Sequence, residues 1–186
     1  WYAPVKKAAA ADAMFHFATE HGLAWSNVTS PMFGRPISLR EQPVFSIRLG
    51  DRDVPSTEWN MIETSTEPGG SFRAECRWSS EDASLIASFE AKRTDARSVL
   101  LSLQMRNAGA VEVTGTLFFP TLSGLTIGSA DDTWYLACRT GGVINKIPCE
   151  WRDEIGEPHA LPLDGFFNPR LGAGVAFMPR DPDGVF

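Results

Sequence analysis

The chain has 186 residues, of which 43% are hydrophobic and 22% are charged, a composition typical of a folded globular protein and not of a disordered one. Its 17 basic and 23 acidic residues give a net charge of -6 without any cluster of Lys or Arg, so we expect no nucleic-acid partner. No apolar run approaches the roughly 18 residues that a membrane-spanning helix needs, so we expect no membrane insertion.

The first residues of the chain are rich in alanine, and residues 6–14 could form a helix. We interpret residues 1–13 as a linker or the remnant of an upstream segment, and we assign residues 14–186 to a single β-sandwich domain. The chain ends just after a turn-forming stretch at 180–184, where another strand would begin. We therefore expect this domain to be a fragment of a longer protein.

Short runs of apolar and aromatic residues typical of strands stand on both sides of the centre of the chain. They cover 15–17, 44–47 and 59–62 before the centre, and 134–136, 143–144 and 175–177 after it. The 16 glycines and 13 prolines are spread along the chain, as the many turns of an all-β protein require. Together with the central strands, this pattern predicts an antiparallel sandwich of about ten to twelve strands.

The centre of the chain has the clearest pattern. Apolar residues alternate with polar ones over four segments, a period of two that is typical of strands with one buried face. The segments are 72–78, 85–91, 99–105 and 111–119, and the polar turns between them are 79–82, 94–96 and 107–110. Because connections this short join only antiparallel neighbours, the four segments predict an antiparallel meander.

The three cysteines show neither a CxxC spacing nor a nearby pair of histidines, so we expect no structural zinc, and no other metal or cofactor is indicated. Cys76 falls on the apolar face of segment 72–78, which predicts a buried thiol. Cys138 and Cys149 are either buried thiols or a disulfide across the glycines at 141–142. A disulfide would indicate an oxidising compartment.

From residue 117 onward, the stretches 117–122, 128–136, 139–144 and 167–172 combine turns and aromatic residues in a recognisable order. In them the chain resembles the β-sandwich domain that precedes the catalytic barrel in bacterial glycoside-hydrolase-like proteins, a domain type similar to the galactose-mutarotase supersandwich. The resemblance implies a supersandwich fold, a glycoside hydrolase as the parent protein, and a secreted or periplasmic location. Its expected partners are a glycan and the catalytic domain of the same polypeptide.

The resembling stretches contain no catalytic signature, so we expect a non-catalytic accessory domain and assign no catalytic residue. Aromatic faces stack on the C–H faces of sugar rings, and guanidinium groups donate hydrogen bonds to hydroxyls. We therefore predict carbohydrate contacts by Trp134, Arg139, Trp151 and Arg152. The other interpretation of Trp134 is a place in the core, where we also expect Trp25, Trp59 and Trp78.

Two further functions are consistent with the residues. One is an autonomous carbohydrate-binding module. The other is a sugar mutarotase or epimerase, in which His159 and either Glu150 or Glu157 would act as general acid and base. A carboxylate pair for glycoside hydrolysis could also come from the acidic segment 150–157, which is otherwise a solvated loop.

A purely structural interaction domain is the last alternative. We interpret Asp131-Asp132 and Asp164-Gly165 as turns.

Overall fold

The computed structural model describes residues 14–29, 39–68, 71–81, 83–95, 98–123, 125, 127–137, 143–145 and 164–178. The chain divides into two compact units, Trp1–Leu125 (unit 1) and Thr126–Phe186 (unit 2). The described residues form fourteen strands and two short 3-10 helices, with no α-helix among them that could cross a membrane. The all-β prediction is confirmed, while the number of strands exceeds the ten to twelve expected. Residues 1–13 lie outside the described part, and one sandwich over 14–186 stays a prediction.

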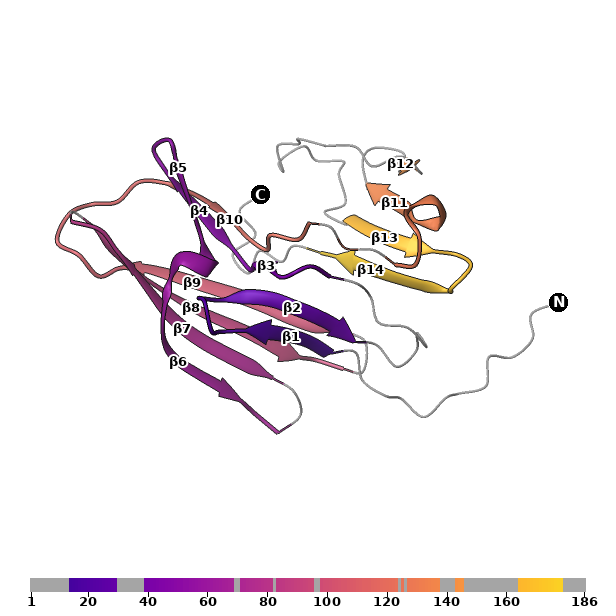
Figure 1. Cartoon of the computed structure of the whole chain (residues 1–186), viewed down its shortest axis with the longest axis horizontal. Coiled ribbons are helices and arrows are strands. Elements are labelled where there is room, and N and C mark those ends of the chain that lie inside the picture. The colour runs from indigo at the N-terminus through magenta and orange to yellow at the C-terminus, as the bar shows by residue number, and fades with distance from the viewer. Residues whose placement is uncertain are drawn as a thin grey trace. The chain divides into compact units, whose positions relative to one another are not determined.

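A four-stranded antiparallel meander forms the largest sheet of unit 1 (Figure 1). Its strands, in spatial order, are β6 (Asn60–Thr66), β7 (Phe72–Ser79), β8 (Ser84–Arg93) and β9 (Val99–Asn107). Three of the four segments predicted from the alternation are therefore present and joined in the predicted order. The fourth member of the sheet is β6, which precedes the other three in the chain.

The prediction that residues 111–119 form the fourth strand of this meander is wrong. Only Thr116–Phe118 is a strand, β10, and it pairs with β4 (Ser46–Leu49) in a different sheet. The apolar alternation already breaks between Val113 and Leu117. Gly115 then allows the close approach to β4, because a Cβ at this position would lie 2.7 Å from the carbonyl oxygen of Arg48.

Two smaller sheets complete unit 1. One has the order β1 (Met14–Ala18), β2 (Ala24–Thr29), β3 (Gln42–Pro43), and the other has the order β10, β4, β5 (Arg52–Pro55). β1 and β2 lie against the meander (Figure 1), since the ring of Phe17 stacks on Phe72 at 4.6 Å and meets Phe89 edge-on at 5.2 Å. This aromatic layer joins the two sheets into a sandwich-like arrangement.

The core of unit 1 follows the predicted alternation. On β7, Ala74, Cys76 and Trp78 are buried, and on β8 the buried side chains include Ala87 and Phe89. Burial of a large apolar side chain stabilises the fold by about 1.5–3 kcal/mol. The predicted burial of Cys76, Trp25, Trp59 and Trp78 is thus confirmed, whereas Cys138 and Cys149 lie outside the described residues.

A fully buried serine connects three segments of unit 1. Ser56 opens the 3-10 helix η1 (Ser56–Glu58) directly after β5. Its Oγ accepts a hydrogen bond from the backbone N–H of Val44 (2.8 Å) and donates one to the carbonyl oxygen of Leu23. Its own N–H donates to Phe45 O (2.8 Å), and its carbonyl accepts from Leu23 N (3.0 Å). Backbone groups that the short strands leave without partners are satisfied in this way.

Unit 2 contains one four-stranded antiparallel sheet, preceded by the 3-10 helix η2 (Ala130–Asp132). Its spatial order is β12 (Val143–Asn145), β11 (Trp134–Ala137), β13 (Asp164–Asn168), β14 (Ala173–Phe177). The predicted turn at Asp131-Asp132 falls in η2. The predicted turn at Asp164-Gly165 is wrong, because both residues begin β13. A Cβ at Gly165 would lie 3.0 Å from the carbonyl oxygen of Val175, so this glycine serves close strand pairing.

We expect Gly22→Ala to destabilise unit 1 strongly. Gly22 has φ +77°, and an added Cβ would lie 2.5 Å from the carbonyl oxygen of Ser56. Gly50→Ala is the matched control, because φ is also positive (+59°) but nothing lies within 4 Å of an added Cβ. The control should lose about 1 kcal/mol in free energy of unfolding and Gly22→Ala more than about 2 kcal/mol, measured by urea unfolding. Equal losses would contradict the role of close packing at Gly22.

We expect the stability of unit 1 to depend on the Cys76 thiol in alkaline solution. Burial, reinforced by the negative charge of Glu75, raises the pKa of this thiol from 9.0 to about 12. The fold keeps the thiol protonated, so its contribution is complete below pH 9 and is lost as the pH rises from 9 towards 12. Urea unfolding above pH 9 should show a steeper loss of stability in the natural chain than in Cys76→Ala. Parallel pH profiles would contradict this.

Candidate functional site

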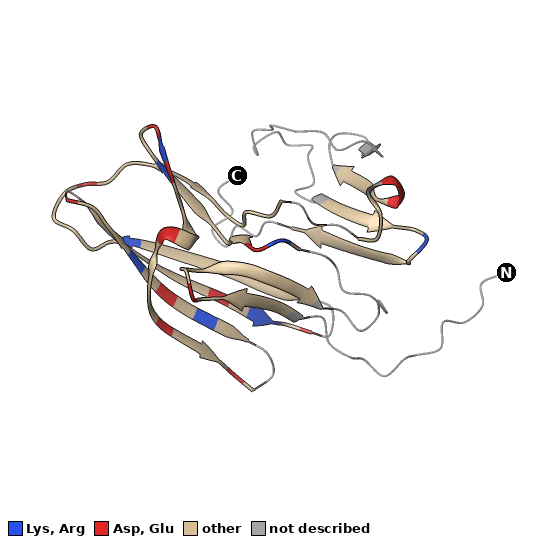
Figure 2. Ribbon diagram, viewed as in Figure 1, with Lys and Arg blue, Asp and Glu red and all other residues tan. Residues whose placement is uncertain are grey.

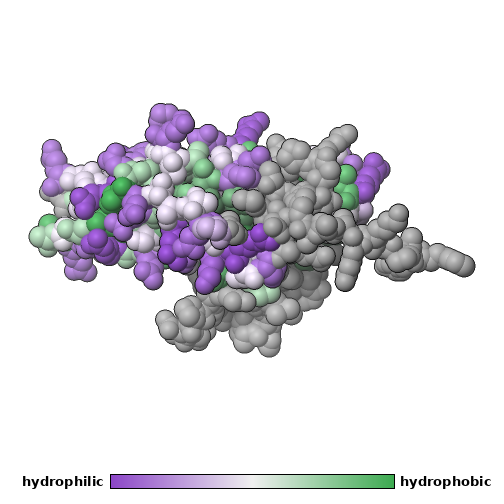
Figure 3. Space-filling model, turned by 90° about the horizontal axis from the view of Figure 1, so that it is seen from below, coloured by the Kyte–Doolittle hydropathy of each residue, from purple (hydrophilic) through white to green (hydrophobic). Residues whose placement is uncertain are grey.

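A concavity of about 420 Å³ opens at one end of unit 1, where three connections meet. They are the β4–β5 hairpin, the β7–β8 turn and the segment that follows β9. Figure 3 shows hydrophobic residues among hydrophilic ones at this end, on the left of the view. The concavity, here called the Trp78 concavity, is lined by Leu49, Arg52, Trp78, Ser80, Ala83, Val111, Glu112, Val113 and Thr114. Its volume falls within the range of about 300–1,000 Å³ that is usual for small-molecule sites.

The wall formed by the segment after β9 is tied to the sheet. Asn107 Oδ1 accepts a hydrogen bond from Gly109 N (2.9 Å), and Asn107 Nδ2 donates to Val111 O (2.6 Å). Ala108 N and Gly109 N also donate to Ser84 O, at 2.7 and 3.2 Å, where β8 begins. The side chains at 111–114 therefore extend from a loop that local hydrogen bonds hold in place.

The other two walls are tight turns. The β4–β5 hairpin turns at Gly50, whose φ of +59° is accessible to glycine at little cost. In the β7–β8 turn, Ser80 N donates to Ala83 O (2.8 Å), and Ser80 Oγ accepts from Ala83 N (3.2 Å). Because loops carried by a rigid sheet are where binding residues concentrate, we consider the Trp78 concavity the leading candidate for a binding site.

The chemistry of the concavity combines an aromatic floor with charged groups at its rim. Trp78 is only 8% exposed, so most of the indole belongs to the core and a narrow strip faces the concavity. The Arg52 guanidinium lies 6.0 Å from the centroid of this ring, and its Nη2 forms an ion pair with Glu58 Oε2 at 3.0 Å. Glu112 and Thr114 add a carboxylate and a hydroxyl. Such a surface suits a ligand with both apolar and hydroxyl-bearing faces.

A second concavity, of about 410 Å³, lies on the polar face of the meander. Arg73 forms ion pairs there with Glu90 (2.9 Å) and with Glu67 (3.2 Å). Figure 2 shows acidic and basic positions alternating over β7 and β8. The register places Glu63 directly opposite Glu75. The lining is mainly polar and charged, and its one aromatic residue, Phe89, is 2% exposed, so we interpret the concavity as part of the solvated face of the sheet.

Of the four predicted carbohydrate-contacting residues, the structure describes Trp134 alone. It lies on β11, half-buried, and its ring stacks on Phe167 of β13 at 6.3 Å with an interplanar angle of 21°. Arg139, Trp151 and Arg152 lie outside the described residues, so their proximity to Trp134 stays a prediction. The same holds for His159, Glu150 and Glu157. Among the described residues, no group of three or more His, Cys, Asp or Glu is placed to hold a metal ion.

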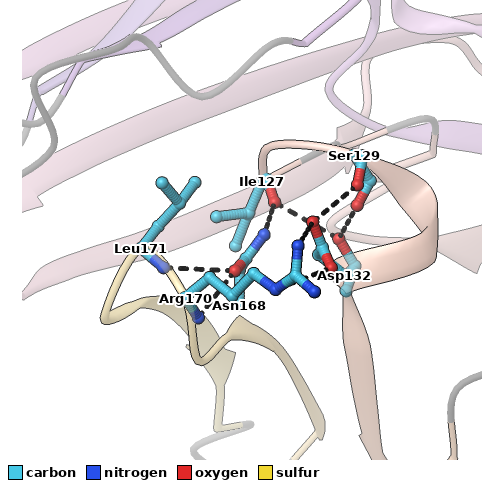
Figure 4. A network of polar contacts seen from close by, with 7 residues as sticks. Ile127, Ser129, Asp132, Asn168, Arg170 and Leu171 are labelled. Carbon is cyan, nitrogen blue, oxygen red and sulfur yellow. Dashed lines mark hydrogen bonds and ion pairs between the residues drawn. The ribbon is translucent and has the colours of Figure 1, made fainter.

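A polar network lies beside Trp134 in the chain, at the turn that joins β13 to β14 (Figure 4). Asn168 is 1% exposed, and its Nδ2 donates to Ile127 O at 2.6 Å. Its Oδ1 accepts from the backbone N–H groups of Arg170 (3.0 Å) and Leu171 (3.2 Å). Arg170 also pairs with Asp132, whose carboxylate accepts from Ser129 Oγ (3.0 Å). Every one of these side chains has a partner within unit 2, which indicates a structural network.

Sequence reasoning missed the composition of the Trp78 concavity. The sequence correctly predicts Trp78 in the core, but its pattern indicates neither Arg52 nor Glu112. No spacing joins the three residues, which come from three separate connections. The one local signal is Gly50-Asp51, a turn signature that places Arg52 at the start of an exposed hairpin strand.

We expect Asn168→Asp to destabilise unit 2. The change removes the donor to Ile127 O and places a carboxylate oxygen against that carbonyl in a buried site, at a cost of about 3 kcal/mol or more. Asn107→Asp is the matched control, because Asn107 makes the same donor and acceptor pattern while exposed to solvent. Hydrogen exchange of the β13 and β14 amides should accelerate in Asn168→Asp only. Acceleration in neither variant would contradict the structural role of Asn168.

The chain matches no protein-family model, no curated protein and no solved structure.

Proposed function

We propose that this chain is a non-catalytic β-sandwich domain that contacts a glycan and accompanies a catalytic domain of the same polypeptide in a bacterial carbohydrate-active enzyme. The Trp78 concavity carries the glycan contact in this proposal. The catalytic partner, the supersandwich type and the secreted or periplasmic location rest on the resemblance of the stretches between residues 117 and 172. Unit 2 would add contacts through Trp134, Arg139, Trp151 and Arg152.

The lining of the Trp78 concavity fits the two faces of a sugar ring. Leu49, Val111 and the indole of Trp78 supply apolar surface for the C–H groups. Arg52 and Glu112 supply planar polar groups that bond pairs of neighbouring hydroxyls, and bound water can complete such contacts. Few polar groups placed around an apolar floor are typical of sites that orient a small ligand.

The charges around the concavity favour a neutral sugar. Arg52 is already paired with the carboxylate of Glu58, and Glu112 adds a second carboxylate to the lining. One cation and two anions leave no excess of positive charge to attract a uronate or a sulfated sugar. We therefore propose a neutral oligosaccharide as the ligand.

Arg52→Ala tests the glycan contact, with Arg48→Ala as its matched control. Both arginines lie on the β4–β5 hairpin, both pair with a carboxylate, and both lie over an aromatic ring. Arg48 pairs with Asp53 at 2.7 Å and lies 5.2 Å from the ring of Phe118, outside the concavity. The two variants therefore lose similar exposed contacts, and only one loses a residue of the concavity.

The isolated chain should bind a member of a panel of neutral oligosaccharides in a glycan array, and isothermal titration calorimetry should measure the affinity. Arg52→Ala should bind at least tenfold more weakly, about 1.4 kcal/mol, while Arg48→Ala should bind like the natural chain. Equal affinity of Arg52→Ala and the natural chain would exclude the Trp78 concavity as the contact. Absence of binding to every neutral oligosaccharide would overturn the proposed function for this chain.

A further inference from the structure

We propose that the free edge of β9 pairs with the β9 edge of a second copy of this chain, joining two meanders into one continuous sheet. The inference is independent of the glycan contact, which lies beyond the end of β9. Among the described residues, β9 is the last strand of its sheet and pairs over all nine of its residues with β8 alone. Alternate N–H and C=O groups of an antiparallel strand point away from its neighbour, so those of β9 are available to another strand.

β9 differs from the other sheet edges of the described residues, because it is long, has no bulge and carries a single charge. β6, at the opposite edge, contains a bulge between Met61 and Glu63, and β1 contains one between His16 and Phe17. The remaining edge strands (β3, β5, β10, β12 and β14) have two to five residues each. β9 has nine residues in unbroken register, without Pro or Gly and with Arg106 as its one charge. Bulges, short length and charges are the usual protections of an edge.

The side chains of β9 also remain partly accessible on the face that is buried elsewhere in the sheet. On β8 the inward residues Ala87, Phe89 and Ala91 are at most 3% exposed. Their cross-strand partners on β9, Met105, Leu103 and Leu101, are half-buried, and Leu100 on the other face is 38% exposed. A strand added beside β9 would cover this apolar surface.

The sequence of β9 is complementary to itself in an antiparallel arrangement. A twofold axis at Leu103 places Leu103 opposite itself, Leu101 opposite Met105, Ser102 opposite Gln104, Leu100 opposite Arg106, and Val99 opposite Asn107. On the inner face Leu101, Leu103 and Met105 then meet one another while Val99 meets Asn107, and on the outer face no like charges face one another. The stem of Arg106 would cover the exposed Leu100. Such a twofold contact closes on itself and predicts a dimer, not a fibre.

Sedimentation velocity of the 186-residue chain tests the dimer. The mass of the sedimenting species should rise with protein concentration, from the 20.4 kDa of one chain towards the mass of two chains. The double variant Ser102→Lys/Gln104→Lys should weaken dimerisation at least tenfold, because lysines would face one another across the interface at both symmetry-related pairs. Within one copy, the lysine at position 102 would face Glu90 and the one at 104 would face Ser88, so the fold should tolerate both. Circular dichroism checks that it does.

The charge-complementary variant Ser102→Lys/Gln104→Glu is the matched control, because lysine would then face glutamate across the interface and the dimer should persist. Hydrogen exchange gives a second measurement, since alternate amides of β9 should become protected as the concentration rises. A chain that stays at 20.4 kDa up to its solubility limit would overturn the proposal. So would a dimer that the double-lysine variant leaves unchanged, because the contact would then lie on another surface.

Discussion

The buried Ser56 side chain and backbone hold together the irregular part of unit 1. Leu23, Val44 and Phe45 come from segments around the short strands β2, β3 and β4, which are too short to satisfy one another's backbone groups. Ser56 supplies or receives the missing hydrogen bonds in a site with no access to water. An unsatisfied backbone group in such a site costs about 1–3 kcal/mol. The three segments therefore stay together, and Phe45 can meet Trp59 edge-on at 5.1 Å.

In unit 2, the side chain of Asn168 likewise supplies hydrogen-bond partners to backbone groups that strand pairing leaves unsatisfied. Asn168, at the end of β13, satisfies a carbonyl of the segment before η2 and two N–H groups of its own turn. In both units, one buried polar residue bonds backbone groups that lie just beyond the ends of the paired strands. Neither residue shows any sign in the sequence of this role, because Ser and Asn are also common in exposed turns.

The two candidate binding surfaces of unit 1, the Trp78 concavity and the edge of β9, occur where regular strand pairing ends. The Trp78 concavity lies where β7 and β9 give way to turns, so the indole that completes the core also lines a surface that can receive a ligand. The free edge of β9 lies where the meander has no further strand. The polar face of the same sheet is different, since Arg73 already pairs with Glu67 and Glu90 and solvent covers the rest. The surfaces of the meander that remain available for binding are therefore those where a strand ends or lacks a neighbour.

The sequence by itself determined the regular part of this protein. The period of two over 72–105 predicted β7, β8 and β9, their antiparallel order and the burial of Cys76 and Trp78, because short turns leave an alternating strand only one way to bury its apolar face. The tertiary structure decided the rest. The polar β6 completes the meander in place of 111–119, and Asp164-Gly165 begins a strand. Arg52, from a separate hairpin, lines the same concavity as Trp78 and Glu112. These outcomes depend on contacts between residues far apart in the chain, and local alternation carries no information about which distant segment provides the better partner.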